Sequence, residues 1–276
     1  MQNKRIIRHP FSSIKTAIAF TAIVFILLGI ATSIKVFQTI QKSIFDGQHQ
    51  FVLLIISANN KATIAAIDPK NNTFSAVYIS NPKKEDIQKN MALGIDGSLH
   101  TSSSISNKKD IEQVLFSSIF SSLGNKTQLT WYDLLRLYGT SRVIGNQNVQ
   151  ESSLTLPANS DVIKNIDGQF VDSALQQENI TIQIINASDI TGLGQQLETL
   201  LTNSGFSVID VRTNQTSINS SVINYDNYDY ATMPYTVSKL GRILGFSLHG
   251  TNKQMIANVQ IIIGKDNADN SKLFIF

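Results

Sequence analysis

The hydrophobic pattern begins with an uncharged apolar run between two lysines. The 19 residues at positions 16–34 contain no charged group and are dominated by Ile, Ala, Phe, Val and Leu. A helix of that length spans the hydrocarbon core of a bilayer, which is about 30 Å thick. We therefore predict a transmembrane helix over residues 14–34, preceded by a tail at residues 1–13. Residues 35–49 keep apolar groups at helical spacing, which predicts a juxtamembrane helix continuous with the first one.

Basic residues set the predicted orientation of this anchor. Residues 1–45 hold six basic groups and no acid, and four of the six precede the apolar run: Lys4, Arg5, Arg8 and Lys15. Because short cytoplasmic segments are enriched in Lys and Arg, we expect the N-terminal tail in the cytoplasm and the rest of the chain outside. A cleavable signal peptide is the alternative, since Ala31 and Ser33 are small residues at a plausible cleavage spacing.

A first α/β domain is predicted at residues 50–145. Residues 51–57 form a near-continuous apolar run, typical of a strand buried on both faces, and residues 62–68 and 73–80 complete a three-stranded meander. Amphipathic helices are expected over 108–123 and 131–138. Thr130 is the expected N-cap of the second helix, and Gly139 its expected end.

A second α/β domain is predicted at residues 179–266, after a polar connector at 146–178 with one or two short elements and before a tail at 267–276. Its expected strands are 181–186, 206–211, 221–225 and 259–263. Its first helix carries a leucine stripe of Leu193, Leu197, Leu200 and Leu201, and its second is capped by Thr232, with Pro234 in the first turn. The fold class is thus α/β (α+β), with a transmembrane helix and then two small extracytoplasmic α/β sandwich domains.

Composition and charge remove several classes of function. There is no cysteine, which excludes disulfides and thiolate metal sites. Beyond residue 45 the chain carries 17 basic and 20 acidic groups, so it lacks the basic excess that nucleic-acid binding needs. The histidines are widely scattered, at His9, His49, His100 and His249. We therefore expect no metal, no cofactor and no nucleic-acid partner.

Candidate binding residues cluster in the second domain. Gly192 and Gly194 lie between a strand and a helix, where free amide groups can bind anions. The third glycine of a dinucleotide fingerprint and the lysine of a P-loop are absent, which favours a tight strand-to-helix junction. Tyr225 belongs to a tyrosine-rich segment suited either to stacking on sugar rings or to capping a small core. The candidate residues for binding a polymer or an anion are Asn186, Ser188, Gly192, Gly194 and Tyr225. No catalytic residue is predicted.

Several motifs of the second domain occur together in a known family. They are the opening TIQIINAS, the Gly192-Leu193-Gly194 helix start, Gly205-Phe206-Ser207-Val208, the SVINY strand and the closing VQIIIGKD. In this order and spacing they resemble the C-terminal domain of LytR-type cell-envelope proteins. That family usually has Asn-Gly where this chain has Asn186-Ala187. The resemblance implies a location in the cell envelope rather than a reaction.

The middle region resembles the catalytic domain of the LytR-CpsA-Psr family in the rhythm of its strands. That enzyme transfers a glycopolymer from a polyprenyl pyrophosphate, and it uses arginines to bind phosphate and aspartates to bind magnesium. Its Arg-x-Asp-Thr motif falls on Asn60-Lys61-Ala62-Thr63, and a later arginine falls on Lys83. Because lysine lacks the bidentate fork of arginine and alanine binds no metal, we expect a degenerate relative without this activity.

The sequence therefore predicts a membrane-anchored, extracytoplasmic and non-catalytic envelope protein. Its expected partner is a cell-wall polymer or another envelope protein. A phosphotransferase of the LytR-CpsA-Psr type is one alternative. A transcriptional attenuator is another, opposed by the acidic balance of the ectodomain and by its expected side of the membrane.

Overall fold

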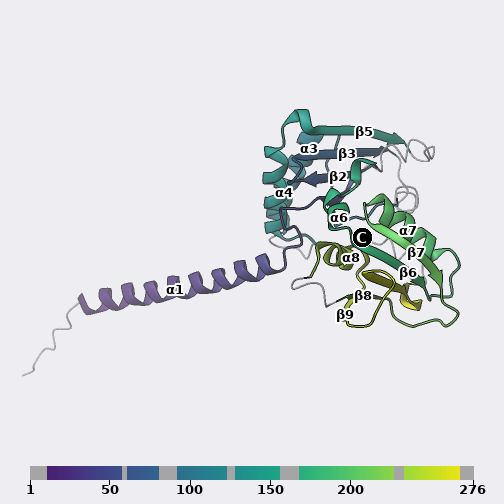
Figure 1. Ribbon diagram of the computed structural model, residues 1–276. Coiled ribbons are helices and arrows are strands. Elements are labelled where there is room, and N and C mark those ends of the chain that lie inside the picture. Colours follow the sequence, from purple (N-terminus) through teal and green to yellow (C-terminus); the bar gives the residue numbers. More distant parts are fainter. Residues whose placement is uncertain are drawn as a thin grey trace, which may run out of the picture. The chain divides into compact units, whose positions relative to one another are not determined.

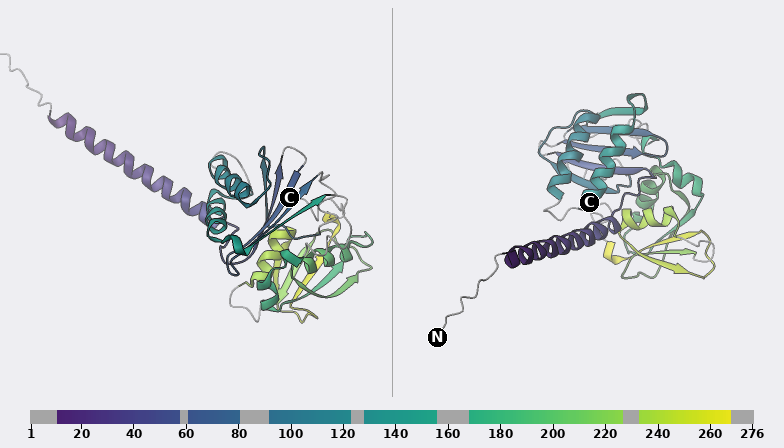
Figure 2. Two further views of the ribbon diagram at one scale, coloured as in Figure 1. Left: turned by 90° about the horizontal axis from the view of Figure 1, so that it is seen from above. Right: turned by 90° about the vertical axis from the view of Figure 1, so that its left-hand side faces the viewer.

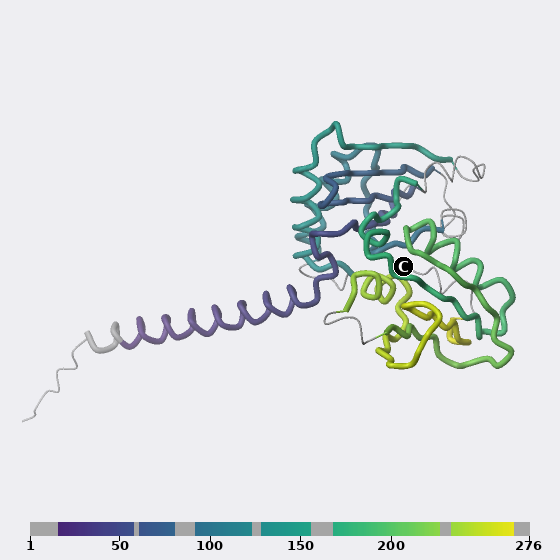
Figure 3. Tube along the Cα trace, viewed as in Figure 1, coloured from purple at the N-terminus to yellow at the C-terminus, as the bar shows by residue number. Residues whose placement is uncertain are grey.

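The computed structural model describes residues 11–57, 61–80, 92–122, 128–155, 168–226 and 233–267 (Figure 3). The chain forms two compact units, Met1–Ser43 and Ile44–Phe276. The second unit holds two five-stranded sheets with their helices (Figure 1). The predicted class, a mixed α/β chain behind an apolar helix, is confirmed. The two sheets, expected as separate domains, lie within one compact unit.

Helix α1 (Phe11–Gln41) makes up most of the first unit. Within it, Thr16–Gln41 is long and apolar enough to cross a membrane, and none of its most apolar window is buried in protein. Leucine and alanine favour helix in such a run, and a helix pairs its backbone polar groups within the segment, as a membrane interior requires. Such an unburied apolar helix near the N-terminus is typical of a membrane anchor or a signal sequence.

The predicted helix over residues 35–49 is correct only as far as Gln41, where α1 ends. Residues 43–46 have no regular structure. Phe45 is 1% exposed in the core beside the first sheet, and its backbone N–H donates to Oδ1 of Asp133 at 2.9 Å. Burial of this ring and the hydrogen bond outweigh the local helical spacing.

The first sheet has the strand order β4-β1-β2-β3-β5. Its strands are β1 (Phe51–Ser57), β2 (Lys61–Asp68), β3 (Thr73–Ser80), β4 (Gly97–Thr101) and β5 (Val149–Thr155). Strands β1, β2 and β3 form the predicted antiparallel meander, and β4 and β5 add to its edges in parallel. The near-continuous apolar run of β1 is buried on both faces, as predicted.

Helices α3 (Lys108–Ser122) and α4 (Trp131–Val143) cover one face of the first sheet (Figure 2). The predicted cap of α4 is confirmed as a capping box, in which Thr130 and Asp133 bond each other's backbone N–H groups. The predicted end at Gly139 is wrong, because α4 continues to Val143. Leu137 and Ser141 are fully buried on either side of Gly139, and this packing carries the helix past the glycine.

Part of the predicted connector at 146–178 belongs to the first sheet. Strand β5 pairs with β3 along its whole length, so the boundary placed at residue 145 is wrong. Its sequence VQESSLT is polar because β5 is an edge strand in which only Leu154 is buried. Further along, the short helix η2 (Gly168–Phe170) places Phe170 in the core on the sheet's other face, and α6 (Ser173–Glu178) follows.

The second sheet has the strand order β7-β6-β10-β8-β9. Its strands are β6 (Thr181–Asn186), β7 (Ser207–Thr213), β8 (Val222–Asp226), β9 (Ser247–Thr251) and β10 (Val259–Ile263). Helices α7 (Leu193–Asn203) and α8 (Tyr235–Leu244) pack on one face of it, in a single core (Figure 2). The leucine stripe of α7 is buried as predicted. Strand β9 was not predicted, since SLHGT carries only one large apolar residue.

The start of α8 differs from the prediction. Thr232, the expected cap, lies outside the described residues, and the N-cap is Pro234, which offers no side-chain hydrogen bond. Glu178 at the end of α6 supplies the cap instead. Its carboxylate accepts from the backbone N–H of Tyr235 at 2.9 Å and of Thr236 at 2.7 Å. A side chain from another helix thus satisfies the free N–H groups of α8.

Candidate functional site

The turn after β6 holds two of the predicted binding residues. Asn186 is 4% exposed, and its Oδ1 accepts from Oγ of Ser188 at 2.6 Å while its Nδ2 donates to the carbonyl of Ile190 at 2.7 Å. The Ser188 Oγ also accepts from the Ile190 backbone N–H at 3.3 Å. The side-chain polar atoms of both residues therefore close the turn that leads into α7.

The two predicted glycines stand at the start of α7. Gly192 is its N-cap with φ 86°, a conformation that other residues adopt only with strain. A Cβ on Gly194 would lie 3.0 Å from Val211, so this glycine lets α7 approach β7. In the same turn, a hydrogen bond from Lys265 lowers the pKa of Asp189. This geometry favours the tight-junction interpretation, because Gly192 supplies the left-handed N-cap and Gly194 the close approach of α7 to β7.

Tyr225 lies far from the other four predicted residues. In β8 it pairs with Val259, whereas Asn186 pairs with Ile263 at the other end of β10. Tyr225 is half-buried against the core of the second sheet. The structure therefore does not bring the five residues into one site, and Tyr228 and Tyr230 lie outside the described residues.

A row of polar side chains crosses the second sheet on the face opposite α7 and α8. Gln183 donates to Asp210 on β7 at 2.7 Å and accepts from Gln260 on β10 at 2.8 Å. Asn224 on β8 donates to Gln260 at 3.4 Å, and the exposed His249 pairs with Asn224 in the register of β9. We call Asp210, Gln183, Gln260, Asn224 and His249 the amide row.

The amide row offers hydrogen-bonding groups at regular intervals. Neighbouring strands lie about 4.8 Å apart, and amide groups both donate and accept. Gln183 is 2% exposed beneath its neighbours, whereas Gln260 and Asn224 are half-buried and His249 is exposed. The two helices that pack on the core face of this sheet, α7 and α8, lie on its other side. The row was not predicted, although the amides of IQI and VQI, each between two core positions, mark the strand face that points away from the core.

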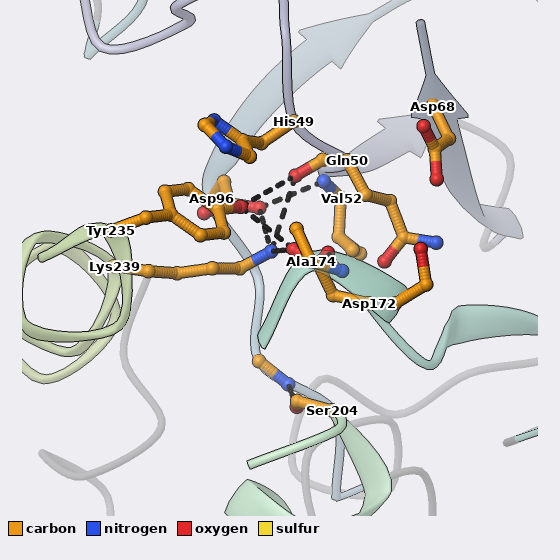
Figure 4. A network of polar contacts seen from close by, with 12 residues as sticks. His49, Gln50, Val52, Asp68, Asp96, Asp172, Ala174, Ser204, Tyr235 and Lys239 are labelled. Atoms are coloured by element: carbon orange, nitrogen blue, oxygen red, sulfur yellow. Dashed lines mark hydrogen bonds and ion pairs between the residues drawn. The ribbon is translucent and has the colours of Figure 1, made fainter. Parts of the chain in front are cut away.

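A buried ionic cluster joins the two sheets (Figure 4). The Nζ of Lys239 on α8 donates to Oδ2 of Asp172 at 2.7 Å and to the carbonyl of Gln50 at 3.1 Å. It lies 3.6 Å from Oδ2 of Asp96, which in turn accepts from the Val52 backbone N–H at 2.9 Å. Gln50, Val52 and Asp96 come from the first sheet's side, and Lys239 from the second.

This cluster is closed to ligands. The side chains of Lys239 and Asp172 are each 1% exposed, and that of Asp96 is 0% exposed. Arg242 reaches Asp96 at 3.4 Å, so two cations face two carboxylates and the charge balances. Because a solute has no access to Nζ of Lys239, the cluster fastens the two sheets together and is not a binding site.

Tyr235 completes the cluster as a neutral hydrogen-bond donor. Burial raises the pKa of its phenol, and the charges of Asp172 and Asp96 raise it further. Its hydroxyl donates to Oδ2 of Asp172 at 2.7 Å. The ring of His49 stacks on the ring of Tyr235, with the ring centroids 3.8 Å apart (Figure 4). This is a second contact between the first sheet's side and α8.

Lys61 and Arg136, two cations that a phosphotransferase site in this region could use, do not converge. Lys61 borders a cavity of about 190 Å³ with Tyr78 and three serines, Ser80, Ser106 and Ser153. Arg136 is held by the carbonyls of Phe45 and Asp46, before the start of β1, whereas Lys61 pairs with Ser57 at the end of that strand. Lys83 and Lys84 lie outside the described residues.

The part of the chain that the structure describes contains no group of three His, Asp or Glu side chains placed to hold a metal ion. Tyr78, beside the cavity, has its pKa raised by burial and by its hydrogen bond to Glu151. It is therefore neutral at physiological pH and is no ready base. The predicted absence of metal, cofactor and catalysis remains a prediction.

Taken together, the second sheet and its helices form an α/β module with a single hydrophobic core. Residues 179–266, from just before β6 to beyond β10, match the family described as LytR cell envelope-related transcriptional attenuator. The predicted resemblance to a LytR C-terminal domain is thereby confirmed, and it links this part of the chain to the cell envelope. No curated protein and no solved structure matches the chain.

Proposed function

We propose that this chain is a membrane-anchored, extracytoplasmic and non-catalytic module of the cell envelope that binds a wall polymer. The observation that carries the proposal is the envelope-related family match at residues 179–266, in a chain whose N-terminal helix is a candidate membrane span. The four basic residues before that span favour a cytoplasmic N-terminus. A cleaved signal segment and a retained anchor both place residues 44–276 outside.

The proposed topology has a direct test. A reporter that is active only outside the membrane should be active when fused after Gly47 and after Phe276. A reporter that is active only in the cytoplasm should be silent at both positions. The mass of the mature chain, measured from the membrane fraction, separates a retained anchor from cleavage near Ala31. A cytoplasmic signal from either fusion contradicts the topology.

The absence of catalysis is supported by what replaces the phosphate-binding and metal-binding groups. Ala62 stands where the resembling enzymes have aspartate, and Arg136 is occupied by two backbone carbonyls. Phosphoryl transfer from a pyrophosphate depends on cations placed at the reacting phosphates. Purified protein should therefore release no phosphate from a polyprenyl pyrophosphate, with or without magnesium. Magnesium-dependent transfer would favour the phosphotransferase alternative.

The amide row is the proposed polymer-binding surface. Hydroxyl groups of an extended polysaccharide are donors and acceptors at regular spacing, and they match amides repeated across adjacent strands. The row lies on the sheet face opposite to α7 and α8. The side chains of Gln183, Gln260 and Asn224 already hydrogen-bond to one another. They therefore lose little conformational entropy when a polymer binds.

Binding should be measured by co-sedimentation of the full chain with purified wall fractions. We expect the double variant Gln260→Ala/Asn224→Ala to bind about fivefold or more weakly, since two hydrogen-bonding groups are lost at about 0.5–1.5 kcal/mol each. Gln196→Ala, an exposed amide on α7, is the matched control and should bind as the wild type does. Equal binding by all three proteins would remove the row from the site. Capture of an envelope protein without polymer would favour the partner-protein alternative.

A further inference from the structure

Helices α3 and α4 carry most of the exposed apolar surface of the second unit. Beyond α1, the described chain exposes seven large hydrophobic side chains, and four of them lie on these two helices. They are Phe116, Phe120, Leu135 and Val143, with exposed fractions of 48%, 63%, 46% and 80%. The other three, Ile209, Met233 and Ile256, are scattered. Isolated exposed apolar residues need no explanation, but a gathered set marks a contact surface.

Phe116, Phe120 and Leu135 belong to a surface that also includes aromatic side chains of α4 and that crosses the two helices. The centroid of the Phe116 ring lies 5.4 Å from that of Phe120 on α3 and 5.3 Å from that of Tyr138 on α4. On α4, Trp131, Leu135 and Tyr138 recur at spacings of four and three, so they share one helical face. We call Phe116, Phe120, Trp131, Leu135 and Tyr138 the aromatic face.

The charges around the aromatic face are positive. Arg142 lies over the Tyr138 ring at 5.8 Å, and the exposed Lys109 begins the same stripe on α3. The acids of these helices are engaged internally: Asp110 accepts from the Ser106 backbone, Glu112 pairs with Lys108, and Asp133 is fully buried. Trp, Tyr and Phe flanked by Arg and Lys is the composition of surfaces that rest in the headgroup layer of a membrane.

The short connection after α1 keeps α4 close to the predicted membrane anchor. The backbone N–H of Ile44, the first residue of the second unit, donates to Oδ1 of Asp133 in the first turn of α4 at 3.0 Å. Helix α1 ends at Gln41, so only Lys42 and Ser43 intervene. Three residue steps extend at most about 10 Å. Any membrane that holds α1 therefore lies within reach of α4.

We propose that the aromatic face docks on the outer surface of the membrane that holds α1, with Lys109 and Arg142 contacting anionic lipid headgroups. This inference rests on the proposed membrane anchoring and adds a second, peripheral contact to it. Docking leaves the amide row, on the other sheet, to a separate ligand. A bilayer is favoured over a soluble partner because the anchor keeps it permanently within reach, at a high effective concentration.

The chain contains one tryptophan, Trp131, and it lies on the proposed face. Its fluorescence therefore reports docking without a label. The full chain should be reconstituted into vesicles containing phosphatidylglycerol, with bromine at defined depths on the acyl chains. We expect shallow bromines to quench Trp131 and dissolved acrylamide to be excluded from it. Vesicles of phosphatidylcholine alone should give weaker quenching, because the headgroup charge is lost.

Variants separate docking from mere proximity to the anchor. Arg142→Gln removes one cation near the headgroups and should shift the docked-to-undocked ratio about fivefold. Leu135→Asp should abolish bromine quenching and restore acrylamide access. Ile209→Asp, an equally exposed position on β7, is the matched control and should leave Trp131 quenched. Circular dichroism checks that each variant is folded. The quenching of Trp131 by shallow bromines in the wild-type protein tests docking even if a variant fails to fold.

The experiment distinguishes failure of the anchoring proposal from failure of the docking proposal. If alkaline carbonate extracts the chain from the vesicles, the anchoring proposal itself has failed. If the chain resists extraction and Trp131 stays open to acrylamide and unquenched by bromine, the docking proposal is overturned while the anchor stands. A Trp131 response to added wall polymer, or one that grows with protein density in the vesicles, would assign the face to a glycan or to a second copy instead.

Discussion

Replacing Lys239 with methionine is expected to lower the free energy of unfolding by about 3–5 kcal/mol. The change keeps the length and apolar stem of the side chain but removes its charge. The Asp172 carboxylate is then buried without a cation, and Asp96 keeps only Arg242 at 3.4 Å. Urea unfolding of the full chain in detergent, followed by circular dichroism, measures the loss.

Two further variants test the electrostatic cause of that loss. Lys253→Met removes an exposed lysine and should change the unfolding free energy by less than about 0.5 kcal/mol. Adding Asp172→Asn to Lys239→Met should recover part of the stability, because a neutral amide is cheaper to bury than an unpaired carboxylate. If Lys239→Met costs no more than Lys253→Met, the cluster does not fasten the two sheets.

Truncating Leu197 to alanine is expected to cost about 2–5 kcal/mol. Leu197 is 1% exposed in the core between α7 and the second sheet, where removal of three carbon atoms leaves a cavity that rigid neighbours do not fill. The same urea titration measures it. Gln196→Ala, one position earlier on the exposed side of α7, is the control and should stay within about 0.5 kcal/mol of the wild type. A loss below about 0.5 kcal/mol for Leu197→Ala would mean that the stripe is not part of the core.

Local sequence patterns correctly predicted the helices and strands in which apolar residues recur at regular spacing. The run at Phe51–Ser57, the α7 leucine stripe and the Thr130 cap each depend on residues close together in the chain, and each is confirmed. Elements with weak apolar periods were missed or misplaced. Strand β5, with only Leu154 buried, was assigned to a connector because an edge strand needs few apolar residues once a neighbour supplies its hydrogen bonds.

Candidate site residues were predicted less well than the strands. Gly192 and Gly194 were considered for their place at a strand-to-helix junction, and the structure uses them to build that junction. The amide row had a local signal in each strand, but its continuity depends on the order β7-β6-β10-β8-β9. Strand order is not written in any one segment, because pairing joins residues far apart in the chain.

The sequence by itself determined the apolar N-terminal helix, the α/β class, the main strands and helices, and the family resemblance at residues 179–266. These follow from composition, period and short motifs. Only the tertiary structure decided what joins the two sheets. Lys239 is bound by Asp172, Asp96 and Gln50, and α8 is capped by Glu178 from another helix. The physical reason is that a buried charge is stable only where folding brings opposite charges and carbonyls around it, and those partners stand 58 to 189 positions away in the chain.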